Sequence, residues 1–189
     1  MSWTFFREFL TNWQTTGAIA PSSAALARRM MRAARVSEAR CLLELGPGTG
    51  AFTRQIQSTL PSGSRYLGLD MNPTFIGSLR SQFPQLRFEQ APAQDFDYEL
   101  FLEGAKFDAI VCGLPWTAFP ESLQTAILDR AFSVLKPGGV FATFAYTGFH
   151  RLPRGQKFRE LLSGHCAKLG TTSTVWGNLP PAFVYMASK

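Results

Sequence analysis

A glycine-rich turn is the segment whose residue types most clearly point to chemistry. Residues 42–50 read Leu-Leu-Glu-Leu-Gly-Pro-Gly-Thr-Gly, and the apolar run that leads into them predicts a strand. Bare backbone at Gly46, Gly48 and Gly50 would let N–H groups approach a ligand at the start of the next helix. The spacing Gly46-x-Gly48-x-x-Ala51 also satisfies the looser dinucleotide fingerprint. The turn alone therefore leaves its ligand open.

Two acidic residues near the turn indicate which ligand it takes. Glu44 lies two residues before Gly46, and Asp70 closes the next predicted strand. A carboxylate at Glu44 would repel a pyrophosphate, but it could hold the ammonium of a methionine moiety through the loop or a water. Asp70 could accept both ribose hydroxyls of an adenosine. The pattern favours S-adenosylmethionine, and the structural alternative is a strand-helix turn without a ligand.

The elements that must position these residues alternate along the chain. Apolar and β-branched runs predict strands at 40–45, 65–70, 86–89, 107–112 and 140–146. Helices are expected at 51–60, at 74–83, and from near residue 120 to the segment Lys136-Pro137-Gly138-Gly139. This alternation implies a mostly parallel sheet that is covered on both faces.

The last part of the chain predicts a different connection. A helix is expected near 156–169, followed by strands at 171–176 and 182–186. The link between these two strands is too short for a helical crossover, so they should pair antiparallel.

Composition and charge narrow the classes of protein. The 189 residues are 46% hydrophobic and 17% charged, which suits one domain with a buried core. No apolar run is long enough to span a membrane, and no secretory leader is expected. Three widely spaced cysteines fit a reducing cytoplasm, and fit neither a disulfide framework nor a zinc site. Two histidines are too few for a His-rich metal centre. A net charge of +6 favours an anionic partner.

Together these features resemble the class I S-adenosylmethionine-dependent methyltransferases. The resemblance rests on Glu-x-Gly-x-Gly-x-Gly at 44–50, the acid at 70, Leu-Lys-Pro-Gly-Gly at 135–139 and the final hairpin. It implies an α/β, Rossmann-like fold over residues 38–189, with a seven-stranded mixed sheet in the order 3-2-1-4-5-7-6. It also implies a cofactor pocket, with Ala93 and Gln94 beside the adenine. The candidate cofactor-binding residues are Glu44, Gly46, Gly48, Gly50, Asp70, Met71, Ala93, Gln94 and Cys112.

A narrower resemblance concerns the acceptor. Thr16 to Ser23, Gly113-Leu114-Pro115 and Asn178 to Tyr185 resemble the soluble bacterial phospholipid N-methyltransferases. That family methylates phosphatidylethanolamine toward phosphatidylcholine, and a related branch methylates ornithine lipids. The chain departs from the pattern at Trp116-Thr117, where aliphatic residues are expected.

The class implies that the acceptor binds beyond strands four and five. Gly113 lacks the side chain that adenine N-methyltransferases place there, so its turn would present backbone carbonyl groups to an aliphatic amine. Tyr146 and His150 are the candidates to orient that amine or accept its proton, and no metal is needed. The candidate substrate contacts are Leu114, Pro115, Trp116, Arg151 and Arg154.

Each of these acceptor residues also has a structural alternative. Trp116 could cover a methyl-bearing ammonium by cation–π contact, or it could be a packed loop residue. Tyr146 and His150 could instead be rim or surface residues. Arg151 and Arg154 could receive a lipid phosphate or be simply solvated.

The N-terminal residues 1–37 predict a helical appendage that binds a membrane and covers the cofactor. At helical spacing, one face carries Trp3, Phe5, Phe6, Phe9, Leu10 and Trp13. Such a face is typical of a helix lying in a membrane interface, and the alternative is a helix packed on its own domain. Arg28, Arg32 and Arg35 share one face of the following helix and could attract anionic lipid.

The leading prediction is a cytoplasmic enzyme on the inner face of the cell membrane. It would transfer methyl groups from S-adenosylmethionine to phosphatidylethanolamine and its methylated derivatives. Ornithine-lipid N-methylation is the first alternative. RNA adenine methylation is another, although no nucleic-acid partner is expected. A non-enzymatic membrane-bending or cofactor-binding protein is the remaining alternative.

Overall fold

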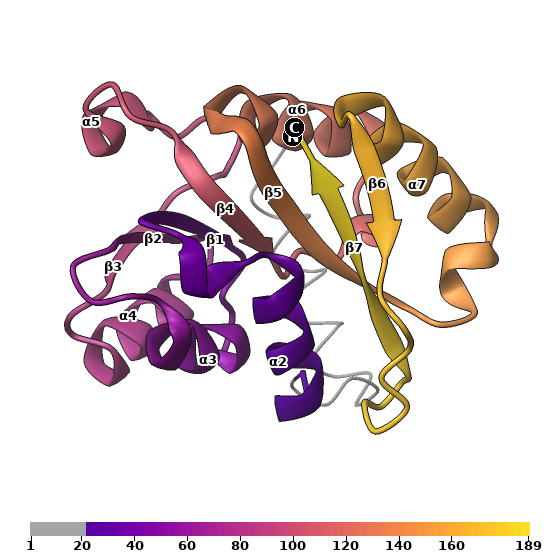
Figure 1. Ribbon diagram of the computed structural model, residues 1–189, viewed down its shortest axis with the longest axis horizontal. Helices are drawn as coiled ribbons and strands as arrows, with labels where there is room; N and C mark the ends of the chain where they lie inside the picture. Colours follow the sequence, from indigo (N-terminus) through magenta and orange to yellow (C-terminus); the bar gives the residue numbers. More distant parts are fainter. Residues whose placement is uncertain (1–21) are drawn as a thin grey trace.

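A single seven-stranded sheet organises the chain, as the computed structural model of residues 22–189 shows (Figure 1). Its strand order β3-β2-β1-β4-β5-β7-β6 confirms the predicted Rossmann-like sheet. The five parallel strands are β1 (Cys41–Leu45), β2 (Arg65–Asp70), β3 (Arg87–Gln90), β4 (Phe107–Cys112) and β5 (Leu135–Tyr146). Strand β7 (Ala182–Ser188) pairs antiparallel with both β5 and β6 (Lys168–Thr171), as predicted.

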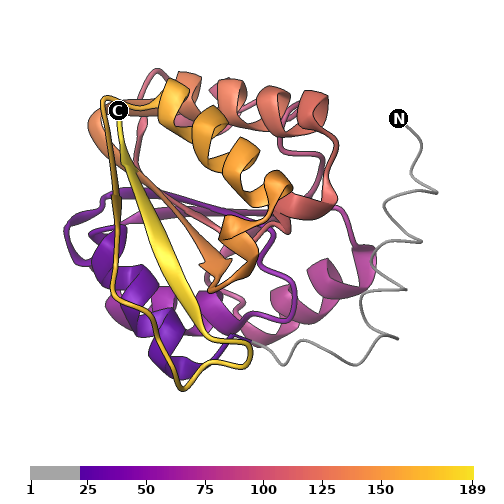
Figure 2. The ribbon, with the colours of Figure 1, turned by 90° about the vertical axis from the view of Figure 1, so that its right-hand side faces the viewer.

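Helices cover both faces of the sheet (Figure 2). One layer contains α2 (Ala24–Ala33), α3 (Ala51–Thr59) and α4 (Pro73–Gln82). The other contains α5 (Glu99–Leu102), α6 (Glu121–Val134) and α7 (Pro153–His165). Three short 3-10 turns are η1 (Val36–Glu38), η2 (Trp116–Ala118) and η3 (Phe149–Arg151). All five residues of β1 are buried, as expected for a central parallel strand covered on both faces.

The helix α2 is part of the core. Ser23 caps it by accepting a hydrogen bond from the Leu26 N–H at 3.2 Å. Leu26 and Met30 are fully buried in a cluster shared with α3, β5 and β7. The described part of the predicted appendage therefore shares the hydrophobic core of the sheet. The membrane-binding face predicted at Trp3, Phe5, Phe6, Phe9, Leu10 and Trp13 lies outside the described residues.

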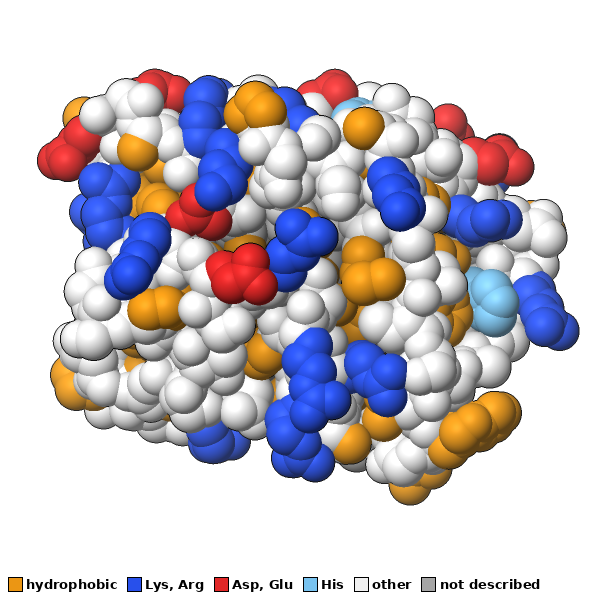
Figure 3. Space-filling model, in the orientation of Figure 1, with side chains coloured by type: hydrophobic (Ala, Val, Ile, Leu, Met, Phe, Trp, Pro, Cys, Tyr) orange, Lys and Arg blue, Asp and Glu red, His pale blue; other side chains and the backbone are white. Residues whose placement is uncertain are grey.

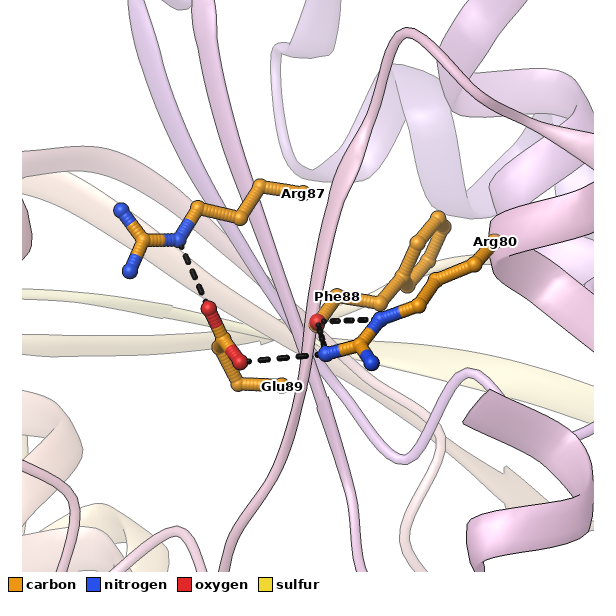
Figure 4. A network of polar contacts seen from close by, with 4 residues as sticks. All are labelled: Arg80, Arg87, Phe88 and Glu89. Carbon is orange, nitrogen blue, oxygen red and sulfur yellow. Dashed lines mark hydrogen bonds and ion pairs between the residues drawn. The ribbon is translucent and has the colours of Figure 1, made fainter. Parts of the chain in front are cut away.

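A polar network fastens the edge strand β3 to α4 (Figure 4). The Arg80 guanidinium donates to the Phe88 carbonyl oxygen, with its Nε at 3.1 Å, and contacts Glu89 at 3.2 Å. Glu89 also accepts from Arg87 Nε at 2.9 Å. Charged side chains on an edge strand disfavour pairing with another chain. The network fixes the strand that leads into the turn containing Ala93 and Gln94.

Three elements differ most from their predicted boundaries. Strand β5 begins five residues early, at Leu135, because Gly138 and Gly139 are paired with Lys189 at the chain end. Helix α7 ends at His165, four residues before the predicted end. Strand β6 covers 168–171 rather than 171–176, because the Thr172 hydroxyl accepts the Val184 N–H and regular pairing stops there.

None of the helices in the described part of the chain is long and apolar enough to cross a membrane.

Candidate active site

The glycine turn after β1 adopts backbone conformations that favour glycine. The φ angles are 67° at Gly46, 57° at Gly48 and 84° at Gly50. A Cβ at Gly46 would lie 2.7 Å from Leu114 Cδ2, whereas a Cβ at Gly48 would meet no described atom within 4 Å. The positive φ therefore favours glycine at position 46, where a Cβ would also displace the Leu114 side chain, and the backbone at Gly48 faces space that a ligand can approach.

The end of β2 places a carboxylate beside this turn. Asp70 is 8% exposed. Its Oδ2 accepts from the Gly48 N–H at 3.0 Å, and its Oδ1 accepts from the Asn72 N–H at 2.8 Å, with Met71 between. Burial raises the pKa of this carboxyl, and the backbone hydrogen bonds oppose that shift. A carboxylate offers about four acceptor positions, so positions remain for ligand hydroxyls.

The turn after β3 lies next to Asp70, as the class implies. The Ala91 N–H donates to the Asp70 carbonyl at 3.2 Å. The Ala93 carbonyl accepts from the Tyr98 hydroxyl at 2.8 Å, which anchors the turn to the core. Gln94 is tethered only through its side chain, to Asp95 at 3.0 Å. Ala93 and Gln94 are thus close in the fold to the residue expected to bind ribose.

Glu44 supports the turn from beneath. Its side chain is 0% exposed, and its Oε2 accepts hydrogen bonds from the hydroxyls of Thr53, at 2.9 Å, and Tyr66. These partners lie on α3 and β2, so Glu44 joins both elements to β1. Burial raises its pKa to about 7. Its Oε1 is buried and has no hydrogen-bond partner among the described residues.

The end of β4 passes close to the glycine turn. The Gly113 N–H donates to the Leu45 carbonyl at 2.8 Å, and a Cβ at Gly113 would lie 2.7 Å from the Gly46 carbonyl oxygen. Close backbone approach therefore explains this glycine. The preceding Cys112 is fully buried, which raises its thiol pKa to about 12. Cys112 is thus a neutral core side chain at the end of β4.

Trp116 corrects a prediction. Its side chain is 4% exposed, its ring stacks on Phe158 at 4.6 Å, and its Nε1 donates to Thr143 Oγ1 at 2.9 Å. The indole is therefore a core residue that joins η2 to α7 and β5. The low exposure of the indole leaves it little surface for a cation–π contact with the acceptor in this arrangement.

The two candidate proton-transfer residues lie on different faces of the sheet. Tyr146 packs on the face of α2 and α3, with its ring 5.4 Å from Phe144. Burial raises its pKa to about 12, so the phenol keeps its proton at neutral pH. The His150 ring packs edge-on against Phe183 on the α7 face, at 4.9 Å. Tyr146 can orient an amine by hydrogen bonding, and the structure does not bring the two groups together.

The two arginines predicted to hold a phosphate line separate cavities. Arg151 lines a cavity of about 760 Å³ between η3, α7, β6 and β7. Arg154 lines another, of about 580 Å³, with Lys157 and Glu121. Its Nη1 also donates to the Thr117 carbonyl at 3.4 Å. Leu114 and Pro115 lie at the end of β4, beside the glycine turn.

Several residues of the first cavity escaped the sequence analysis. Arg159 on α7 and Tyr185 on β7 line it together with His150. No motif marks Arg159, and Tyr185 lies at the end of a motif that gave it no role, because only the packing of α7 against the terminal hairpin brings the two residues together. Within residues 22–189, no group of three or more His, Cys, Asp or Glu side chains could hold a metal ion.

Comparison with known proteins identifies the family. Residues 42–139 match the family described as Methyltransferase domain. The ornithine lipid N-methyltransferase of Singulisphaera acidiphila is 31% identical over 141 residues, which cover 72% of this chain and 73% of that protein. The fold and the glycine turn thus define a class I S-adenosylmethionine-dependent methyltransferase. The chain belongs to this family.

Solved structures share the fold at low identity. The O-methyltransferase from Bacillus cereus, in complex with S-adenosylhomocysteine, has a TM-score of 0.69 at 18% identity and covers 100% of this chain and 92% of that chain. The N-methyltransferase NodS from Bradyrhizobium japonicum, in complex with S-adenosyl-L-homocysteine, has a TM-score of 0.67 at 16% identity. That match covers 86% of this chain and 85% of the other.

S-adenosylmethionine is the cofactor, and the residues of the site fit it. The backbone at Gly48 is open, and α3 begins at Ala51 after Gly50, which provides no side-chain cap, so N–H groups of its first turn remain available. Asp70 keeps acceptor positions that ribose hydroxyls would take, and Ala93 lies in the turn next to Asp70, where the adenine is expected. Glu44 Oε1 is a buried acceptor beneath the turn.

Proposed function

We propose that this methyltransferase acts on the primary amine of an amino-lipid headgroup at a membrane surface. We place ornithine lipid ahead of phosphatidylethanolamine as the acceptor. The order reverses the prediction from sequence, because the relative from Singulisphaera acidiphila carries the name ornithine lipid N-methyltransferase.

The observation that carries the proposal is an apolar edge beside a polar cavity. We call Phe149, Leu152, Trp176 and Leu179 the apolar edge. Each is more than half exposed. They lie on η3 and on the loop before β7, the two segments that flank the cavity containing Arg151. Hydrophobic side chains project over this loop at the lower right of Figure 3. Bulky apolar side chains around a polar cavity suit a surface that meets lipid acyl chains and headgroups together.

The cofactor supplies an electrophilic methyl group when bound, so the protein must deliver a neutral amine to it. A primary aliphatic amine has a pKa of about 10, and deprotonation at neutral pH costs roughly 4 kcal/mol. The turn at Gly113 and Leu114 can present backbone carbonyl groups to the amine. Tyr146 can only donate or orient at neutral pH, because its pKa is raised to about 12. His150 is the remaining proton acceptor of the predicted pair.

The direct test is methyl transfer from labelled S-adenosylmethionine to vesicle lipids. Separate vesicles should contain ornithine lipid, phosphatidylethanolamine or neither amine, in an otherwise identical phosphatidylcholine background. Labelled lipid should appear with the first two and be strongest with ornithine lipid. A parallel reaction should offer RNA as the acceptor. If the RNA became labelled and no vesicle yielded labelled lipid, the proposal would be rejected.

The apolar edge supplies a prediction with a matched control. Trp176→Ser and Leu179→Ser together should weaken vesicle binding by about thirty-fold, since they remove at least about 2 kcal/mol of apolar transfer free energy. Affinity for S-adenosylhomocysteine, measured by calorimetry, should not change. Leu100→Ser removes an equally exposed leucine on α5, away from this edge, and should leave vesicle binding intact. Equal losses in both variants would contradict a role for the apolar edge.

A further inference from the structure

The cavity beside the apolar edge carries unsatisfied polar atoms. Two of the residues that line it each have a buried side-chain atom without a hydrogen-bond partner among the described residues, the Tyr185 hydroxyl and His150 Nδ1. Tyr185 is 1% exposed, and its ring packs against Phe183 at 5.0 Å and Phe158 at 6.3 Å. Burying such groups without a partner is costly, so buried polar atoms are nearly always paired. Two such atoms on one cavity point to a polar ligand.

The charges of the lining favour an anion. Arg151 and Arg159 line the cavity, and neither forms an ion pair with any described residue. Glu160 is the one acidic side chain among the lining residues, so the lining is net positive without counting His150. Burial raises the pKa of Tyr185 and the charge of Arg159 opposes that shift, which places the guanidinium within electrostatic reach of the hydroxyl.

The walls of the cavity are held by close packing. A Cβ at Gly155 would lie 2.5 Å from the Phe149 carbonyl oxygen and 2.7 Å from His150 Cα. The absence of a side chain at Gly155 therefore lets η3 lie directly on α7. On the opposite wall, the Thr147 and Thr174 hydroxyls lie 3.3 Å apart. The position of His150 relative to α7 is thus fixed before any ligand arrives.

We propose that this cavity binds the oxyanion of a lipid headgroup, a phosphodiester or a carboxylate. Arg159 and Arg151 supply the charge, and the Tyr185 hydroxyl donates a hydrogen bond to the anion. The apolar edge flanks the cavity, so we take the ligand to be a lipid. This identification rests on the proposed function. The oxyanion comes from one of two sources: the acceptor lipid itself, or a neighbouring anionic lipid.

Direct binding of soluble headgroups tests the cavity without any methyl transfer. The probes are sn-glycero-3-phosphoethanolamine and Nα-acetylornithine, titrated by calorimetry into the full-length protein saturated with S-adenosylhomocysteine. Arg159→Gln and Tyr185→Phe should each weaken probe binding roughly ten-fold, as expected for lost hydrogen bonds to a charged group. Glu160→Gln, on the same wall, removes a repulsive charge and should strengthen binding a few-fold.

The Tyr185→Phe variant guards against a folding artefact. Removing a buried, unpartnered hydroxyl should leave the midpoint of thermal unfolding unchanged or raise it. Unchanged probe affinity in both Arg159→Gln and Tyr185→Phe would overturn the proposal. So would a wild-type protein that binds neither probe.

Vesicle kinetics separate the two sources of the oxyanion. If the acceptor supplies it, Arg159→Gln should raise the KM for the amine lipid in uncharged vesicles about ten-fold while kcat holds. If a neighbouring lipid supplies it, stimulation by added phosphatidylglycerol should disappear in Arg159→Gln and the KM should hold. If Arg159→Gln altered neither the KM nor the stimulation by phosphatidylglycerol, that result would contradict the proposal. Intact probe binding by an enzyme that methylates no lipid would contradict the proposed function and leave the cavity site standing.

Discussion

The two carboxylates near the glycine turn have different surroundings, although the sequence analysis assigned both to the cofactor. Asp70 lies at the rim and binds the Gly48 N–H, where further ligands can reach it. Glu44 is fully buried and binds the hydroxyls of Thr53 and Tyr66. A motif identifies which residue types surround a turn. It does not show how deeply each carboxylate is buried or which side chains bind it, because both depend on residues from other elements.

Glu44 makes the stability of the protein depend on pH. Burial raises its pKa from an ordinary value of 4.5 to about 7, so the folded protein holds this proton more tightly than the unfolded chain. The stabilisation is fully present below pH 4.5 and is lost as the pH rises through about 7. Its size is about 3 kcal/mol by linkage. Urea unfolding at pH 5 and pH 8 should show the loss.

Glu44→Gln should remove most of this difference, because a neutral amide of the same shape does not titrate. Glu38→Gln changes an exposed carboxylate on η1 and serves as the control, which should retain the wild-type dependence on pH. If Glu44→Gln kept the full wild-type difference, the titration would belong to another group.

The residues of the cavity between η3, α7, β6 and β7 could be predicted only in part from the sequence. His150 and Arg151 were found from their position after β5, whereas Arg159 carried no signal and Tyr185 lay in a motif that assigned it no role. Residue 159 lies on α7 and residue 185 on β7, so only the tertiary packing of the terminal hairpin makes them neighbours.

Between elements, the site depends on how closely the ends of β1 and β4 approach. The Leu45 carbonyl accepts a hydrogen bond from the Gly113 N–H, which brings the two turns into backbone contact.

The parallel strands were predicted within a few residues, because each is a short apolar run ended by a turn signal. The terminal hairpin was predicted less well. The pairing of β6 with β7 stops at the Thr172 hydroxyl, and the pairing of the chain end with β5 involves Lys189; neither residue has a local pattern that predicts this.

Gly113→Ala tests this approach of the two turns. The added methyl would lie 2.7 Å from the Gly46 carbonyl oxygen, so the glycine turn must shift. We expect a loss of about 1–3 kcal/mol in unfolding free energy and weaker binding of S-adenosylhomocysteine. The control is Gly77→Ala on α4, where a Cβ meets no described atom within 4 Å. It should stabilise the fold by about 0.5–1 kcal/mol and leave binding unchanged. Equal cofactor affinity in both variants would contradict the argument.

Across the whole molecule, charge and apolar surface gather at one edge. Arg29 Nη1 donates to Ser173 Oγ at 2.6 Å, and the Ser23 N–H donates to Asn178 Oδ1 at 2.9 Å. These contacts hold α2 against the loop that carries Trp176. Basic side chains gather over α2, beside the projecting hydrophobic side chains (Figure 3). The net charge of +6 is thus partly concentrated next to the apolar edge.

This arrangement predicts two separable components of vesicle binding. Arg28 and Arg32 are exposed on α2, and each basic residue near an anionic surface contributes about 1 kcal/mol. Arg28→Gln with Arg32→Gln should therefore weaken binding to anionic vesicles about thirty-fold at low salt, and much less at high salt. Binding to uncharged vesicles should stay the same, because the apolar edge is intact. Sedimentation with vesicles of both compositions measures the two components.

The matched control removes the same charge from the opposite end of the strands, away from the loop that carries Trp176. Lys106 precedes β4 and Lys168 begins β6 opposite the end of β7, so both lie away from the loop of Trp176. Lys106→Gln with Lys168→Gln lowers the net charge by the same two units and should leave anionic vesicle binding close to wild type. If the Lys106→Gln, Lys168→Gln variant loses as much binding to anionic vesicles as the α2 variant, the attraction to these vesicles depends on the net charge of the protein alone. The protein would then have no preferred membrane-facing edge, which would also remove the physical reason for placing the acceptor lipid beside η3.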